Sequence, residues 1–300
     1  MRVAVLTDST AYLPRELAAE YGVHVVPLYV VLAGRSGREG EDISSEDVAK
    51  ALSSRGQRVS TSRPTPGDFV AAYRGALEAG ADRLVSVHLS AELSGTWDAA
   101  RVAASQVGEH IVSVVDSRSA AMGTGFAVLE AARAAAGGAD RDEVDRIARE
   151  AAARTRTLFV VDTLEHLRRG GRIGSAAAVL GSALAVKPVL HVVDGRVVPL
   201  EKVRTSARAL GRLVQHVVDH AGEREVSLAV HHLAAADRAD RLVTELRERV
   251  PRLRELYVSE LGAAIGAHVG PGALGVVISA GPDAPEEPAA VPEGDDDRTG

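Results

Sequence analysis

The sequence contains no cysteine, and aromatic residues make up only 3% of it. Without cysteine, the chain has no disulfides, thiolate nucleophiles, cysteine-type zinc sites or iron–sulfur clusters. No uncharged apolar run approaches the roughly 18 residues that indicate a membrane-spanning helix. The first residues, MRVAVLTDST, also lack the long apolar core of a secretory signal peptide. We therefore expect a cytoplasmic protein with no stable membrane insertion.

Net charge is concentrated at the end of the chain. The 300 residues carry a formal charge of −6, and residues 282–300 hold seven acidic side chains, one arginine and four prolines. The preceding residues are therefore formally neutral, which disfavours a nucleic-acid-binding surface. The terminal segment has too little apolar surface to offset the entropy of ordering. We predict that residues 281–300 form a disordered, acidic, proline-rich tail.

The first half of the chain alternates short β-branched runs with alanine-rich stretches. This alternation is typical of βαβ units and a parallel sheet. It predicts strands over residues 2–7, 23–32, 83–89 and 110–115. It also predicts helices over residues 14–21, 44–55, 66–79, 94–107, 123–136 and 140–155.

The second half has a different order of elements. Asp194-Gly195 lies between two apolar runs, a strong signal for a β-hairpin. Further strands are predicted over 158–161, 225–231, 253–258 and 273–279, and helices over 173–185, 205–221, 235–249 and 263–268. We predict an α/β protein of two domains: a three-layer parallel-sheet α/β domain over 1–156 and a mixed-sheet α/β domain over 157–280.

Small hydroxyl side chains lie in four predicted loops: Asp8-Ser9-Thr10 after strand 2–7, Thr61-Ser62 before helix 66–79, Ser94-Gly95-Thr96 after strand 83–89 and Asp116-Ser117 after strand 110–115. Each of these residues also suits a helix N-cap, which is the alternative interpretation. Because parallel strands end at one edge of a sheet, the four loops are expected to converge, and helix N-termini with free hydroxyls bind anions. The loops contain no lysine and no Ser–His pair at a recognisable spacing, so they favour holding an anion over cleaving a bond.

Several familiar motifs are missing. The sequence has no phosphate-binding Gly-x-x-x-x-Gly-Lys-Ser/Thr loop. Gly123-Thr124-Gly125 follows a predicted strand and opens a predicted helix, but Val128 occupies the third glycine position of a dinucleotide-binding turn. His216 and His220 are four residues apart without a His-Glu-x-x-His pattern, so we expect surface histidines and no metal site.

Two basic segments are candidates for an anionic ligand. Arg168, Arg169 and Arg172 surround a glycine pair, and His268 lies in a His-Val-Gly-Pro-Gly turn. Either segment can supply a cation or a hydrogen-bond donor. The alternatives are a tight turn with solvated charges and a structural histidine.

Seven segments, in this order, resemble the DegV family of bacterial fatty-acid-binding proteins. They are VLTDSTAYLP (5–14), TSRPTPGDF (61–69), LSAELSGTW (89–97), VVDSRSA (114–120), DTLEHLRRGGRIG (162–174), KPVL (187–190) and GAHVGPGALG (266–275). The resemblance is colinear over nearly all of residues 2–279. It implies a two-domain fold with the acyl chain of a long-chain fatty acid in an apolar tunnel, and with no other cofactor.

The resemblance also implies roles for particular residues. It places the fatty-acid carboxylate on Thr61 and Ser94, with Ser62 and Thr96 as secondary candidates. Arg172 and His268 match family positions near the head group, and no residue is assigned a catalytic role. Arg63 stands where the family commonly has glutamine.

In family members that are fatty acid kinase subunits, a separate ATP-binding partner converts the bound acid to an acyl phosphate. Arg204 matches a basic position associated with handling of the partner or product. Two alternatives stay open. One is a stand-alone enzyme that uses Arg172 and His268 on a phosphate or acyl ligand between the domains, and the other is an interaction module that uses the acidic tail.

Overall fold

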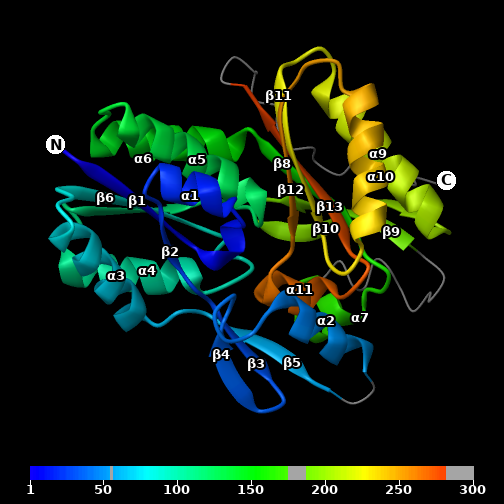
Figure 1. Cartoon of the computed structure of the whole chain (residues 1–300), viewed down its shortest axis with the longest axis horizontal. Coiled ribbons are helices and arrows are strands. Elements are labelled where there is room, and N and C mark those ends of the chain that lie inside the picture. Colours follow the sequence, from blue (N-terminus) through cyan, green and yellow to red (C-terminus); the bar gives the residue numbers. More distant parts are fainter. Residues whose placement is uncertain (55–56, 175–186, 282–300) are drawn as a thin grey trace, which may run out of the picture.

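The computed structural model describes residues 1–54, 57–174 and 187–281. The predicted tail, apart from Gly281, and the predicted helix over 173–185, apart from its first two residues, lie outside this range. Two large sheets organise the described part of the chain, and Figure 1 shows them side by side. No helix in this part is both long and apolar enough to cross a membrane.

The first sheet is parallel throughout and has the strand order β2-β1-β6-β7. Its strands are β1 (Val3–Asp8), β2 (His24–Val26), β6 (Arg83–His88) and β7 (Val112–Asp116). The helices around it are α1 (Arg15–Glu20), α3 (Pro66–Glu78), α4 (Thr96–Val107), α5 (Met122–Ala136) and α6 (Arg141–Ala153). Helices α5 and α6 cover one face and α3 and α4 the other, each over its own apolar core. The predicted three-layer parallel-sheet arrangement is confirmed (Figure 1).

The second sheet is mixed and has the order β10-β9-β8-β13-β11-β12, with only the β11–β12 pair parallel. Its strands are β8 (Thr155–Val160), β9 (Lys187–Val193), β10 (Arg196–Val203), β11 (Val226–His232), β12 (Leu253–Glu260) and β13 (Leu274–Ala280). On its outer face lie α9 (Ser206–Ala221) and α10 (Ala236–Arg249). The short helices α7 (Glu165–Arg169) and α11 (Ala263–Val269) lie on the inner side, towards the first half. The mixed-sheet α/β class is confirmed, while the boundary at residues 156 and 157 stays a prediction.

The hairpin predicted at Asp194-Gly195 joins β9 and β10. Both residues have a positive φ, 50° for Asp194 and 78° for Gly195. A two-residue turn with positive φ at both positions matches the right-handed twist of the flanking strands.

One predicted strand is wrong in its extent. Residues 23–32 form two strands in different sheets, β2 and β3 (Tyr29–Leu32), on either side of Pro27. Proline has no backbone N–H to donate to a ladder, so the chain leaves the first sheet at this point. Strand β3 then begins a small third sheet that the sequence analysis did not predict.

The third sheet has the order β4-β3-β5, with β4 (Arg35–Arg38) and β5 (Val59–Ser62) antiparallel to β3. Helix α2 (Ser45–Ser53) connects β4 to the segment before β5 and packs against α11. Strand β5 includes Thr61 and Ser62, which the sequence predicted to lie in a loop. Strands β3, β4 and β5 are short, and their sequences do not alternate clearly between apolar and polar residues. Within β3 only Val30 is fully buried.

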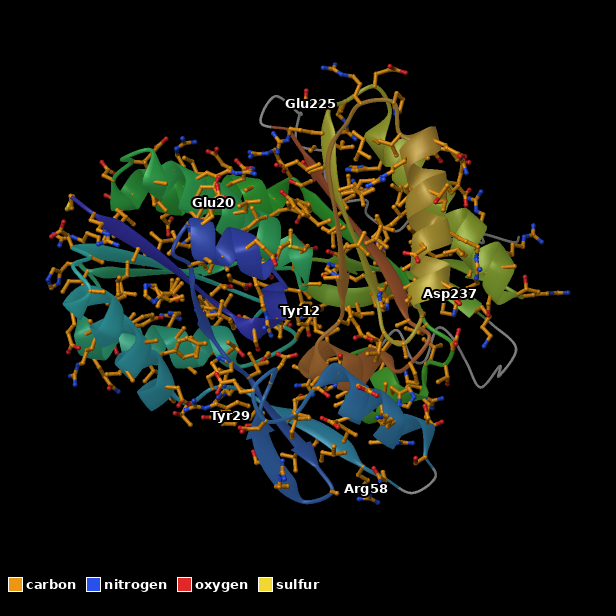
Figure 2. All side chains as sticks on the ribbon, viewed as in Figure 1. Tyr12, Glu20, Tyr29, Arg58, Glu225 and Asp237 are labelled. Atoms are coloured by element: carbon orange, nitrogen blue, oxygen red, sulfur yellow. The ribbon has the colours of Figure 1, made fainter. Side chains whose placement is uncertain are left out.

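A buried carboxylate links the third sheet to α11. Glu39, at the end of β4, accepts hydrogen bonds from Ser9 Oγ, from Tyr12 OH at 3.1 Å and from the Ala264 backbone N–H at 2.8 Å. Tyr12 OH in turn accepts the Ile265 N–H at 3.2 Å, and Figure 2 shows Tyr12 between the first sheet and α11. Burial raises the pKa of Glu39, whereas these hydrogen bonds lower it. The contacts fix the start of α11 relative to the first half of the chain.

A second polar network lies inside the first sheet. Asp8 accepts hydrogen bonds from the backbone N–H groups of Thr10 and Leu89 and from His88 Nδ1, at 3.0, 3.1 and 2.9 Å. His88 Nε2 lies 2.7 Å from Ser86 Oγ. The Ser–His–Asp order resembles a catalytic triad. All three side chains are fully buried, so a substrate cannot reach them and the network has a structural role.

We expect Asp8→Ala to lower the free energy of unfolding by at least about 3 kcal/mol. Three buried N–H donors lose their acceptor, as does the Thr10 hydroxyl, and each unsatisfied N–H group costs about 1–3 kcal/mol. Chemical denaturation measures the change. The control is Asp82→Ala, which removes an exposed acceptor of the Arg2 N–H and is expected to cost about 1 kcal/mol or less. Equal effects of the two substitutions would contradict the assignment.

Candidate functional site

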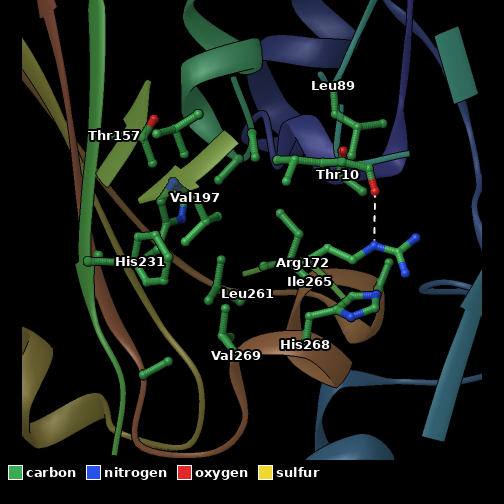
Figure 3. A pocket seen from close by; sticks show the side chains of 18 of the residues that line it. Thr10, Leu89, Thr157, Arg172, Val197, His231, Leu261, Ile265, His268 and Val269 are labelled. Atoms are coloured by element: carbon green, nitrogen blue, oxygen red, sulfur yellow. Dashed lines mark hydrogen bonds between the residues drawn. The ribbon is translucent and has the colours of Figure 1, made fainter. Parts of the chain in front are cut away.

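A cavity lies where the two large sheets face each other. The cavity has a volume of about 110 Å³. Its walls come from the inner face of the mixed sheet, from α11 and from loops at the carboxyl ends of the first sheet (Figure 3). Most of the lining is aliphatic: Leu28, Leu89, Leu93, Ala120, Ala121, Leu167, Val192, Val197, Leu261, Ala264, Ile265, Val269, Ala273 and Val277.

Four polar side chains gather at one end of this cavity, which we call the neck: Thr61, Ser94, Arg172 and His268. They come from β5, from the loop before α4, from the residues after α7 and from α11. Thr61, Arg172 and His268 also border a second, open depression, which we call the polar cleft. The neck therefore connects an apolar interior to a polar surface.

Thr61 and His268 are in direct contact at the neck, with 2.8 Å between Thr61 Oγ1 and His268 Nε2. If the imidazole proton is on Nε2, this N–H donates to Thr61 and leaves the threonine hydroxyl free to donate to a ligand. If the proton is on Nδ1, the threonine hydroxyl donates to the ring and has no hydrogen left. A bound carboxylate would therefore select the tautomer with the proton on Nε2.

His268 is neutral near pH 7. Burial, together with the nearby charge of Arg172, lowers its pKa to about 4. Its Nδ1 atom is buried without a hydrogen-bond partner among the described residues. The ring lies against Gly170, where a Cβ atom would be only 2.2 Å from Nδ1. Because Gly170 has no side chain, the His268 ring can occupy this position, from which it contacts Thr61.

Arg172 brings a positive charge to the neck. Its Nε donates to the Leu93 carbonyl at 3.0 Å, the bond drawn in Figure 3, and its Nη1 donates to the Gly170 carbonyl. Within the described residues, Nη2 has no partner. Two backbone carbonyls therefore fix the orientation of the guanidinium and leave one of its nitrogens to donate to an anion.

Ser94 lies just before α4. Its hydroxyl is 2.9 Å from that of Thr96, which is fully buried behind it and does not line the cavity. Gly95 is the N-cap of α4, and the side chain of Arg63 packs directly against it. A Cβ at Gly95 would be 2.2 Å from Arg63 Nη1, so Arg63 connects the Thr61 and Ser94 loops.

The structure brings four of the seven predicted site residues together and separates the other three from the cavity. Ser62 follows Thr61 along β5, points to the opposite face and is exposed. Arg204 is exposed after β10 and lines neither the cavity nor the polar cleft. Thr96 contacts the neck only through Ser94. Their roles, like those of the neck residues, stay predictions.

Three polar residues that the sequence analysis did not assign to a site also line the cavity. Thr10 donates to the Asp8 carboxylate, and Thr157 Oγ1 lies 3.0 Å from Ser119 Oγ. His231 accepts the Met122 N–H through Nε2, and its Nδ1 lies 3.0 Å from Ser259 Oγ. Burial lowers the pKa of His231 to about 4, so this ring is neutral. Thr157 and His231 lie across the cavity from Arg172 and His268 (Figure 3).

These features define a class: an α/β protein with a parallel and a mixed sheet, an apolar cavity between them and a cluster of polar side chains at one end of the cavity. The family model described as "uncharacterised protein, DegV family" matches residues 2–281. The chain belongs to the DegV family.

Relatives and solved structures agree with this assignment. A DegV domain-containing protein of Streptomyces coelicolor is 54% identical over 277 residues, covering 92% of this chain and 98% of the relative. A DegV family protein from Thermus thermophilus, described for its fatty acid binding, superposes with a TM-score of 0.86 at 36% identity, covering 93% of this chain and all of that one. DegV of Bacillus subtilis, described as a fatty acid binding protein, gives 0.85 at 35% identity over 94% of this chain and all of that one.

We expect Gly170→Ala to displace the His268 ring, because the added Cβ would overlap Nδ1. A displaced ring becomes more accessible to water, so its pKa should rise from about 4 towards its ordinary value. An NMR titration of the imidazole resonances measures the shift. Gly75→Ala is the control, since nothing lies within 4 Å of a Cβ there. An unchanged His268 pKa in Gly170→Ala would contradict the packing.

Proposed function

We propose that this chain binds a long-chain fatty acid, with its carboxylate at the neck and its acyl chain in the cavity, and presents it to a separate ATP-dependent kinase. One observation carries the proposal: an apolar cavity has two hydroxyls, an arginine and a histidine gathered at one end. The fatty acid binding described for the Thermus and Bacillus relatives supports it.

The cavity accounts for most of the expected affinity. Burying the fourteen methylenes of a sixteen-carbon acid, at about 0.8 kcal/mol each, contributes roughly 11 kcal/mol before ordering costs are subtracted. The carboxylate contributes mainly orientation, because an unpaired buried charge would be strongly unfavourable. Thr61, Ser94 and Arg172 offer donors to its oxygens.

The polar cleft supports the second half of the proposal. It is open to solvent and adds Arg58, His166 and Arg169 to the neck residues that border it. In the proposed reaction a carboxylate oxygen attacks the γ-phosphorus of ATP, the bond to the bridging oxygen breaks, and ADP leaves as the acyl phosphate forms. The described residues would bind and orient the acid, while the partner would supply ATP.

A stand-alone enzyme is the second candidate, and the Thr61–His268 contact favours it. A hydroxyl within 2.8 Å of an imidazole resembles a nucleophile with its base. In such a pair a third group normally orients the base, yet His268 Nδ1 has no partner among the described residues. We therefore prefer the binding role.

The double variant Thr61→Ala, Ser94→Ala should lose at least about tenfold in fatty acid affinity, since each lost hydrogen bond to a charged group is worth about 1.5–3 kcal/mol. Denaturation and extraction of the purified protein, followed by mass spectrometry, measure the retained acid. Ser62→Ala is the matched control, because this hydroxyl is exposed on the other face of β5. Retention by the double variant equal to wild type would mean that the carboxylate is held elsewhere.

The kinase role has its own test. The fatty-acid-loaded chain is incubated with ATP, with and without a purified ATP-binding fatty acid kinase subunit, and acyl phosphate is trapped with hydroxylamine. We expect hydroxamate only when both proteins are present. Product from this chain alone, lost in His268→Ala, would favour the stand-alone enzyme.

A further inference from the structure

Gly275 lies at the centre of the cavity wall formed by the mixed sheet. Strand β13 pairs with β8 on one side and β11 on the other, which aligns Gly275 with Phe159 and with His231. All three residues line the cavity. The row therefore consists of two rings with no side chain between them.

The missing side chain exposes the main chain of β13. Four consecutive residues, 274–277, line the cavity, although side chains of a strand alternate between its faces. Leu274 and Val276 belong to the core under α9 and α10, on the opposite face. They therefore reach the cavity through backbone atoms beside Gly275.

Neither the backbone nor the packing requires glycine at this position. The φ angle of Gly275 is not positive, so an L-residue can adopt its backbone conformation. A Cβ there would meet the Leu158 carbonyl oxygen and Phe159 Cβ at 3.4 Å and His231 Cβ at 4.0 Å, which are ordinary contacts. Glycine weakens a strand interior and often marks the close approach of a ligand.

We infer that Gly275 forms a trough for the acyl chain and lets a straight chain extend along the mixed sheet past this row, an inference that rests on the proposed function. The walls are Phe159 and His231, whose strands are two spacings apart, about 10 Å. The floor is backbone whose hydrogen bonds are made to both neighbouring strands, so an apolar chain can lie on it without stranding a polar group. Beyond this row the cavity continues to Thr157 and Val277.

The test compares wild type, Gly275→Ala and Gly275→Val after removal of bound lipid. Isothermal titration with saturated fatty acids of increasing length, from about eight to about eighteen carbons, gives each affinity profile. For long acids Gly275→Val should lose about fourfold for each methylene that the valine excludes. Acids that end before the row should keep wild-type affinity, and Gly275→Ala should lie between the two.

Gly75→Ala, a glycine substitution in α3 away from the cavity, is the matched control and should leave the profile unchanged. Undiminished short-chain binding shows that the variants are folded, and the alanine variant keeps the test valid if the valine variant does not fold. Two results would overturn the inference and leave the proposed function intact. In the first, wild type, Gly275→Ala and Gly275→Val give identical affinity profiles. In the second, both variants lose the same affinity at every chain length. A wild-type protein that binds no acid of any length would instead overturn the proposed function.

Discussion

The hydrogen bond between Thr61 and His268 is the contact on which the site depends. It joins residues 207 positions apart, one from the small third sheet and one from α11. On one side the histidine ring packs against Gly170, whose carbonyl accepts a hydrogen bond from Arg172, and on the other the Glu39 carboxylate fixes the start of α11. The neck is therefore assembled from four parts of the chain, and movement of any of them would separate its donors.

Polar groups around the apolar cavity are nearly all satisfied within the protein. Thr10, Thr157 and His231 each have a hydrogen-bond partner, so the interior can accept an apolar chain without leaving their polar atoms unpaired. Among the described residues that line the cavity, the buried side-chain polar atom without a hydrogen-bond partner is His268 Nδ1, at the neck. This contrast in hydrogen bonding gives a bound amphipathic molecule a single favourable orientation.

Much of the fold followed from local patterns. The β-branched runs predicted β1, β6 and β7 because a buried parallel strand is apolar throughout, and Asp194-Gly195 predicted the hairpin because its turn is chemically specific. The third sheet escaped prediction, because β4 and β5 are short and become strands only by pairing with β3. Ser62 was grouped with Thr61 for a related reason: without knowing that residues 59–62 are a strand, one cannot tell that the two side chains point to opposite faces.

The sequence by itself determined the fold class and, through the order of its family motifs, proposed Thr61, Ser94, Arg172 and His268 as candidate site residues, because motif order and residue chemistry are local properties. Only the tertiary structure decided that these four meet at one end of an apolar cavity. It also decided that Phe159, Gly275 and His231 form one row across three strands. Cavity shape arises from the docking of two sheets whose facing residues are far apart in the chain, and no local pattern encodes that register.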